Sequence, residues 1–181
     1  DVLTRGMTAG REQVERQLEL LRKHFPGFAN ARLTQTCPMV GVRATRRIAG
    51  EYKLSVDEAR GGAHHADTIA LTGFHWDLAA PGSAQRMLHR VEMALPYVEI
   101  PYRCIVPQGI SNLLAPGRAL SADWDVLGPC RIMPAVFAMG QAAGMAAAMA
   151  VDGGAAMRDV DLATLRDGLR ATGAIVDGQP A

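Results

Sequence analysis

The sequence has few cysteines and little net charge, and both shortages exclude classes of protein. Its 181 residues include only Cys37, Cys104 and Cys130, an odd number without CxxC spacing, so neither a disulfide framework nor a zinc or other metal site is expected. The formal net charge is +1 and no run of Lys or Arg forms a basic stripe, which argues against a nucleic-acid partner. Unpaired cysteines favour a reducing, cytoplasmic location.

The start of the sequence also lacks an export signal. Residue 1 is Asp, and no charged-then-apolar segment follows it. The length corresponds to one domain or slightly more. Because residue 1 is not Met, we expect a fragment, a processed product or a trimmed part of a longer chain.

One apolar run, residues 132–151, has the length of a membrane span but not its usual composition. Most of it is Ala, Leu is absent, and Gln141 is its only strongly polar side chain. Spanning helices normally carry larger apolar residues with aromatic flanks. The spacing of Gly140 and Gly144 permits close approach of a neighbouring element in soluble proteins too. We predict a soluble helix over 133–150, kept thin because other groups lie against it, and no membrane partner.

Periodicity and turn residues predict a mixed α/β (α+β) fold. Ser55 and Glu58 form a capping box for a short helix that ends at Gly61 and Gly62. Two more helices are predicted at 9–24 and after the N-cap Asp161, the latter ending near Gly173. Strands are predicted around 42–48 and at 67–78, 98–107 and 112–122. Residues 81–95 are ambiguous, with helix as one reading.

The start of the 133–150 helix is predicted to be electropositive. Its first N–H groups have no helical partner, and Arg131 precedes them. Pro134 in the first turn costs nothing, because no helical hydrogen bond is lost there. Such a start suits an anion or a developing negative charge, although a plain core helix explains most of the composition.

Two stretches resemble one protein family. "IPYRCIVPQGISNLLAPGRALSADWDVLGPCRIMPAVFAMGQAAGMAAAMA" (100–150) resembles the C-terminal flavin-binding segment of the FAD-dependent oxidoreductases, relatives of the fumarate reductase and succinate dehydrogenase flavoproteins. "GVRATRRIAGEYKLS" (41–55) resembles a second motif in their substrate domain. The resemblance implies a substrate-domain portion at 1–100, the last strand and helix of a Rossmann-like FAD domain at 101–155, and a terminal helix at 156–181.

The resemblance also implies FAD as cofactor and a set of residues that hold it. Three would line its ribityl side: Gly117, Arg118 and Ser121. Three would lie at the flavin edge: Ile132, Met133 and Pro134. Arg131 and the helix start would stabilise negative charge on the reduced ring.

Basic and aromatic residues are candidates for the substrate side of a catalytic site. Arg43 and Arg47 share one face of the predicted 42–48 strand, with Arg46 on the other, and are suited to clamping a carboxylate or polarising a carbonyl. Pairing with a carboxylate such as Glu51 is the alternative. Trp124 stands where relatives often have histidine, and it would stack on a hydrophobic substrate.

Histidines are weaker candidates. His75 and Asp77 share one face of the predicted 67–78 strand, which suits proton transfer, although core or surface placement is the simpler reading. A second histidine position of the family is Ala79 here. His64 and His65 follow a Gly-rich turn and are more often simply exposed.

The sequence lacks the GxGxxG motif that binds a dinucleotide pyrophosphate. We therefore expect a second polypeptide or a cleaved N-terminal piece to supply that half, in an oligomer that transfers a hydride between a small organic substrate and FAD. One alternative is a non-catalytic subunit that binds no flavin. Another is an Ala/Gly-rich helical interaction module with accidental similarity.

Overall fold

The fold is described from a computed structural model over residues 1–44, 46–77 and 92–178. The chain divides into two compact units, Asp1–Arg43 and Ala44–Ala181, and each is described by itself. Ala79 and most of the ambiguous segment 81–95 lie outside the described residues. Residues 92–95 form no helix.

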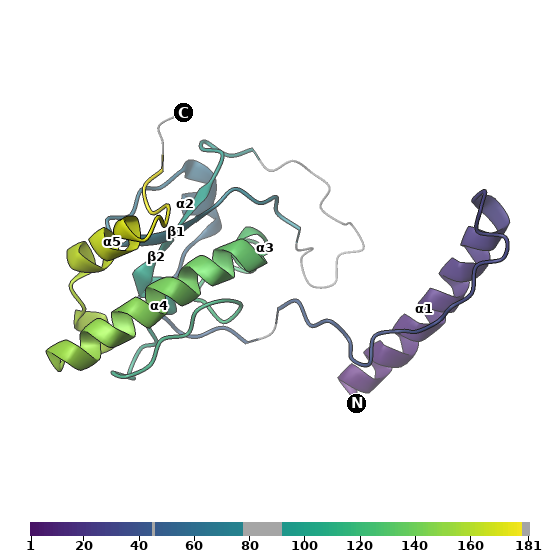
Figure 1. The fold of residues 1–181 in the computed structure, drawn as a ribbon, viewed down its shortest axis with the longest axis horizontal. Coiled ribbons are helices and arrows are strands. Elements are labelled where there is room, and N and C mark those ends of the chain that lie inside the picture. The colour runs from purple at the N-terminus through teal and green to yellow at the C-terminus, as the bar shows by residue number, and fades with distance from the viewer. Residues whose placement is uncertain (45, 78–91, 179–181) are drawn as a thin grey trace. The chain divides into compact units, whose positions relative to one another are not determined.

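A single helix, α1 (Val2–His24), makes up most of the first unit (Figure 1). It confirms the helix predicted over 9–24 and begins earlier, at Val2. The chain turns back at Gly27, whose φ of 88° is strain-free only for glycine. The Arg22 guanidinium donates to the carbonyl of Ala31 at 2.7 and 2.9 Å, so the returning segment is attached to the last turns of the helix.

The second unit is built on two antiparallel strands, β1 (Thr68–Thr72) and β2 (Val98–Pro101), with Ala70 opposite Ile100. Helices α4 (Met133–Gly153) and α5 (Leu162–Ala171) both contact β1 and pack on each other (Figure 1). The short elements are α2 (Val56–Gly61), η1 (Tyr102–Ile105), α3 (Leu127–Cys130) and η2 (Met157–Asp159). The largest fully buried side chains come from all parts of this unit: Tyr102, Leu54, Ile69, Ile100, Ile105, Leu120, Leu127, Met139, Leu165 and Leu169.

The predicted helix ends of this unit are confirmed. The Ser55 hydroxyl accepts from the Glu58 N–H while the Glu58 carboxylate accepts from the Ser55 N–H, which completes the capping box of α2. Gly62 ends that helix at a φ of 69°. Asp161 accepts from the Ala163 N–H at the start of α5, and Gly173 follows its end at a φ of 83°.

Two predicted strands are wrong. Within the described part of 42–48 and throughout 112–122 the chain is irregular, although the residues around both stretches do meet. Ile48 N–H donates to Ala119, and Leu54 and Ser121 are joined through a backbone hydrogen bond. Pro116 and Gly117 interrupt the second segment, so no continuous ladder forms and the two stretches are joined only through scattered bonds and isolated bridges, such as Leu54 with Ala122. The architecture is mixed helix and strand, and the sheet of the described residues has two strands rather than a Rossmann-like parallel set.

Two other strands are shorter than predicted. Strand β2 ends at Pro101, where the chain enters the 3-10 turn η1. Strand β1 ends at Thr72, so His75 and Asp77 do not lie on it. Their expected common strand face is therefore absent.

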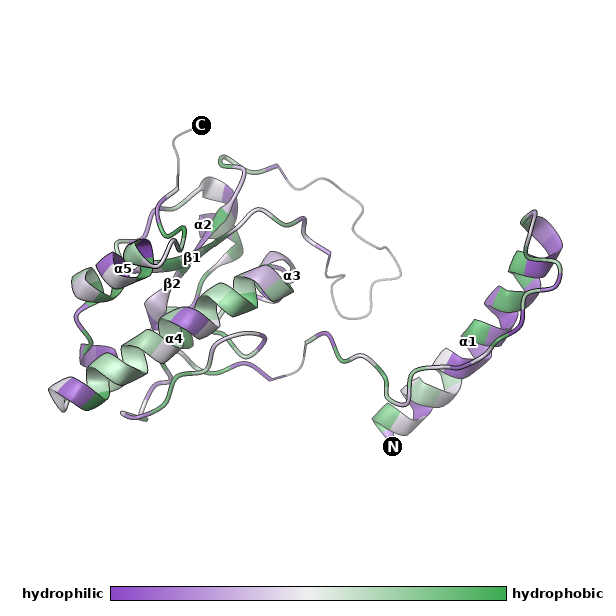
Figure 2. Cartoon of the chain, viewed as in Figure 1, coloured by the Kyte–Doolittle hydropathy of each residue, from purple (hydrophilic) through white to green (hydrophobic). Residues whose placement is uncertain are grey.

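Small residues on α4 let it lie close to the sheet, as predicted. One stripe at helical spacing is buried: Ala135, Met139, Ala142, Ala146 and Ala150. The opposite face is exposed and partly apolar, with Met133 72%, Phe137 71% and Val151 77% accessible (Figure 2). By length and composition alone α4 is also the one helix of the described residues that passes the test for a membrane span, with a third of its most apolar window buried.

Candidate functional site

The site predicted from the sequence centres on the start of α4. Ile132 is the N-cap, with extended backbone (φ −70°, ψ 155°), and its side chain caps no N–H group. Pro134 has no N–H to offer, while Met133 and Pro134 are exposed. The uncapped donors and the helix dipole therefore make an exposed, electropositive surface.

The Gly-Arg stretch lies against this helix start. Gly117 is buried with a φ of 87°, and a Cβ added there would lie 3.4 Å from the Cγ1 of Val136, in the first turns of α4. Arg118 next to it is exposed. The strand that was expected to end in Gly117 and Arg118 does not form. The two segments are brought together by a turn that only glycine makes easily.

Arg131 does not present a lone charge to the helix start. Its Nη2 contacts both oxygens of Asp77, at 2.9 and 3.0 Å, and its side chain is only 11% exposed. Gly128 permits this pairing, since a Cβ there would lie 3.0 Å from the backbone nitrogen of Asp77. The Nε of Arg131 is buried and has no hydrogen-bond partner among the described residues. Asp77 therefore largely neutralises the positive charge that was expected at Arg131, and the Nε–H group remains as a donor.

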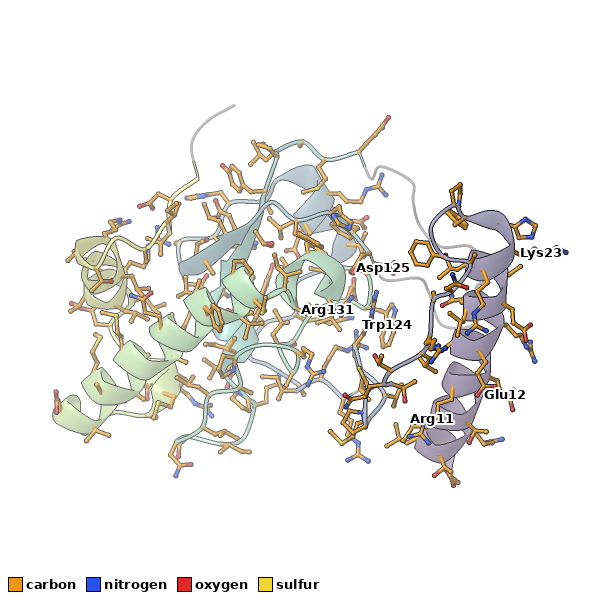
Figure 3. The ribbon with its side chains drawn as sticks, turned by 45° about the vertical axis from the view of Figure 1, so that its right-hand side comes forward. Arg11, Glu12, Lys23, Trp124, Asp125 and Arg131 are labelled. Atoms are coloured by element: carbon orange, nitrogen blue, oxygen red, sulfur yellow. The ribbon has the colours of Figure 1, made fainter. Side chains whose placement is uncertain are left out.

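A basic hollow of about 510 Å³ opens elsewhere in the same unit. It is lined by Arg46, Arg47, Ile48, Ala49, Lys53, Ser121 and Ala122. Two predicted substrate-side residues meet beside it, because the Arg47 guanidinium carbon lies 5.6 Å from the centre of the Trp124 ring. Figure 3 shows Trp124, Asp125 and Arg131 near one another at the end of the unit where α4 begins.

The hollow corrects one expectation and adds a residue. Arg46 was expected to face away from Arg47, but both line the hollow because the segment is not a strand. Ser121, expected at the ribityl side of FAD, also lines it. Lys53 was not singled out by the sequence, although it belongs to the "GEYKL" part of the second motif. Its Nζ lies 2.5 Å from Asp123, and that hydrogen bond lowers the pKa of Asp123.

Other predicted residues lie apart from these groups. His75 is exposed, with its ring 4.1 Å from that of Phe74, and its expected partner Asp77 pairs with Arg131 instead. Arg43 is exposed and is the last residue of the first unit. Among the residues that the structure describes, no three His, Cys, Asp or Glu side chains form a group suited to a metal.

Three buried side chains serve the fold rather than chemistry. Burial raises the pKa of the Cys104 thiol to about 12 and also raises that of Cys130, which makes both unreactive. Glu99 is buried and accepts from the Thr68 hydroxyl at 2.6 Å and the His65 N–H at 2.8 Å. Burial alone would raise the pKa of Glu99, but these bonds and His64 hold it below its usual value.

Comparison with known families decides the identity of the chain. The family model described as FAD dependent oxidoreductase matches residues 2–169, nearly the whole sequence. The chain belongs to this family. No curated protein and no solved structure matches it.

Membership in the FAD-dependent oxidoreductases makes FAD the cofactor, and the residues at the α4 start fit one edge of it. The uncapped N–H groups and the unpaired Nε of Arg131 suit the carbonyl-rich edge of the flavin ring. Gly117 allows backbone to approach closely. The sequence contains no GxGxxG motif, the usual pyrophosphate-binding motif of dinucleotide-binding folds.

Proposed function

We propose that this chain supplies the flavin-facing surface of an oxidoreductase that transfers a hydride between a small organic substrate and FAD. Bound FAD supplies the two-electron redox chemistry. The proposal rests on one observation above all, the exposed, uncapped start of α4 beside the Gly117 turn. A second polypeptide or another piece of the same protein provides the GxGxxG half, in a cytoplasmic oligomer related to the fumarate reductase group.

In that reaction, residues of this chain bind the cofactor and the substrate and orient them. Backbone N–H groups at Met133 and Ala135 would stabilise negative charge on a bound flavin, because a fixed dipole needs no rearrangement. Ile132, Met133 and Pro134 would hold the ring, and Arg118 and the Gly117 backbone would hold the ribityl chain. The ion pair with Asp77 fixes the orientation of the Arg131 guanidinium, including its Nε–H group.

Arg47 and Trp124 act on the substrate side. The guanidinium donates one N–H to the Ala122 carbonyl at 3.0 Å, and the nearby indole ring restricts its motion. Such a fixed cation orients a polar group of the substrate. We propose no role in catalysis for His75, since its carboxylate partner is engaged elsewhere.

A charge placed at the helix start tests the flavin assignment. Met133→Asp puts a carboxylate at an exposed first-turn position, which complements the helix dipole but repels negative charge on a bound ring. We expect flavin affinity to fall several-fold and the flavin reduction potential to become more negative, with no loss of folding stability. Both are measured on the assembled flavoprotein by flavin absorbance and redox titration.

Val151→Asp is the matched control, because it adds the same charge to an equally exposed position near the other end of α4. It should leave flavin affinity and potential unchanged. Equal effects of the two substitutions would show that the flavin does not lie at the start of α4.

A further inference from the structure

The ion pair between Arg131 and Asp77 lies at the start of α4. Arg131 is the C-cap of α3 and directly precedes Ile132, the N-cap of α4. The N-terminus of a helix carries partial positive charge, so a guanidinium without a counter-charge is disfavoured there. Asp77 supplies the counter-charge, with its two oxygens 2.9 and 3.0 Å from Nη2 of Arg131. The carboxylate is therefore part of the electrostatic environment of the helix start.

The fold holds Asp77 in this place through the residues around it. Trp76, just before it, is buried. The Thr72 hydroxyl, also buried, donates to the carbonyl of Pro129 at 2.7 Å and so attaches the end of β1 to α3. Gly128 leaves room for the backbone of Asp77, since a Cβ at residue 128 would lie 3.0 Å from the Asp77 nitrogen. Packing therefore positions the Asp77 carboxylate.

Partial burial extends the reach of these charges. The side chains of Arg131 and Asp77 are 11% and 25% exposed, so water screens them only in part. A hydride brings two electrons and one proton to a bound flavin ring and leaves it with one more negative charge. The positive charges of Arg131 and the helix start stabilise that negative charge together. Asp77 lowers this combined positive field.

We propose that Asp77 is a positioning residue that sets the reduction potential of the flavin. By offsetting the charge of Arg131, it limits how strongly the α4 start favours the reduced, negatively charged ring. This inference rests on the proposed function, since it needs a flavin beside the start of α4. It adds to that function the residue that restrains the positive field. Without the Asp77 charge, the site binds reduced flavin more tightly and passes its electrons on less readily.

The test is a redox titration of the assembled flavoprotein carrying Asp77→Asn, which removes the charge and keeps the shape of the side chain. We expect a more positive reduction potential and a several-fold rise in affinity for reduced flavin relative to oxidised flavin. Glu51→Gln is the matched control. It removes a carboxylate that is 31% exposed from an ion pair with Arg158, a residue of η2, which follows the other end of α4. This control should leave the potential unchanged.

Two further variants separate the effect of charge from an effect on folding. Asp77→Glu keeps the charge and should keep the potential close to that of the unmodified protein. Combining Asp77→Asn with Arg131→Gln removes both charges and should reverse most of the shift that Asp77→Asn causes alone. A shift caused by loosened packing would persist in this double variant.

An unchanged or more negative potential in Asp77→Asn would overturn the inference, as would an equal shift in Glu51→Gln or a shift that the double variant retains in full. If Met133→Asp lowers the potential while Asp77→Asn leaves it unchanged, only this inference fails. If Met133→Asp and Val151→Asp have equal effects, the proposed function itself fails.

Discussion

Single residues show how strongly this chain relies on paired charges near the α4 start. The Arg131–Asp77 pair joins side chains 54 positions apart, with Arg131 11% and Asp77 25% exposed. Removing one partner leaves a buried guanidinium without its counter-charge. Such losses cost more than the pair contributes when both partners are present.

Asp77→Asn should therefore lower the free energy of unfolding by about 2 kcal/mol, less than for a fully buried pair because Asp77 is partly exposed. Urea unfolding followed by tryptophan fluorescence measures this, since Trp76 and Trp124 both belong to the second unit. Arg158→Gln, which breaks a more exposed pair with Glu51 at 3.1 Å, should cost about 0.5 kcal/mol. Equal costs would mean that the Arg131 pair is not a special feature of this surface.

The environment of Glu99 predicts that the folded chain loses stability in acid. Its pKa in the folded chain is held below the unfolded value by hydrogen bonds from Thr68, His65 and His64, against the opposing effect of burial. A depressed carboxylate pKa contributes stability above the unfolded pKa of about 4.3, and that stability is lost as the pH falls through the folded pKa. We expect the unfolding free energy to decline below about pH 5.

The pH slope identifies the group responsible. Glu99→Gln should make the curve flatter in this range, and Thr68→Val, which removes one hydrogen bond, should flatten it in part. Denaturant unfolding at a series of pH values measures both. An unchanged slope in Glu99→Gln would assign the acid sensitivity to other carboxylates.

At the scale of elements, α4 is the clearest example of sequence determining structure. Its buried alanine stripe lets β1 and α5 lie close to the helix backbone. Ala146 is fully buried and Ala148 is exposed on the same helix. Ala146→Leu should therefore cost about 1–3 kcal/mol by overpacking, whereas Ala148→Leu should change stability by less than about 0.5 kcal/mol.

Thermal or urea unfolding of the two variants compares them directly, because they add the same atoms to the same helix. Similar costs would mean that the small residues of α4 do not serve close packing in this unit.

Helices were easier to predict than strands, for a physical reason. Helix α4, the capping box of α2 and the Asp161 cap of α5 depend on residues within a few positions of each other. A strand at 42–48 or 112–122 needs a continuous partner, and alternation alone does not supply one. Pro116 and Gly117 in the second stretch allow contact with the first but not a regular ladder.

The features of the candidate site also differ in how far the sequence predicts them. The sequence assigned Gly117 and the α4 start to the same cofactor by resemblance, but their contact with each other is a finding of the structure. The pairing of Arg131 with Asp77 and the approach of Arg47 to Trp124 depend on the folded chain, which the sequence pattern does not encode locally. Lys53 enters the hollow only because 46–54 is irregular and bends around Ser121 and Ala122.

For the molecule as a whole, the central claim is that this chain is one part of a flavin site. It has family membership over residues 2–169 and a surface that fits the ring edge, but no motif for the pyrophosphate. Under the proposed function, a chain with this combination holds FAD only together with another polypeptide or piece that carries the motif.

A native mass spectrum of the protein isolated from its source, followed by a denaturing spectrum, tests this claim most directly. The account predicts a complex of this chain with a second polypeptide and a mass equal to FAD, and separate masses for the chains after denaturation. A lone 181-residue chain without flavin would contradict it.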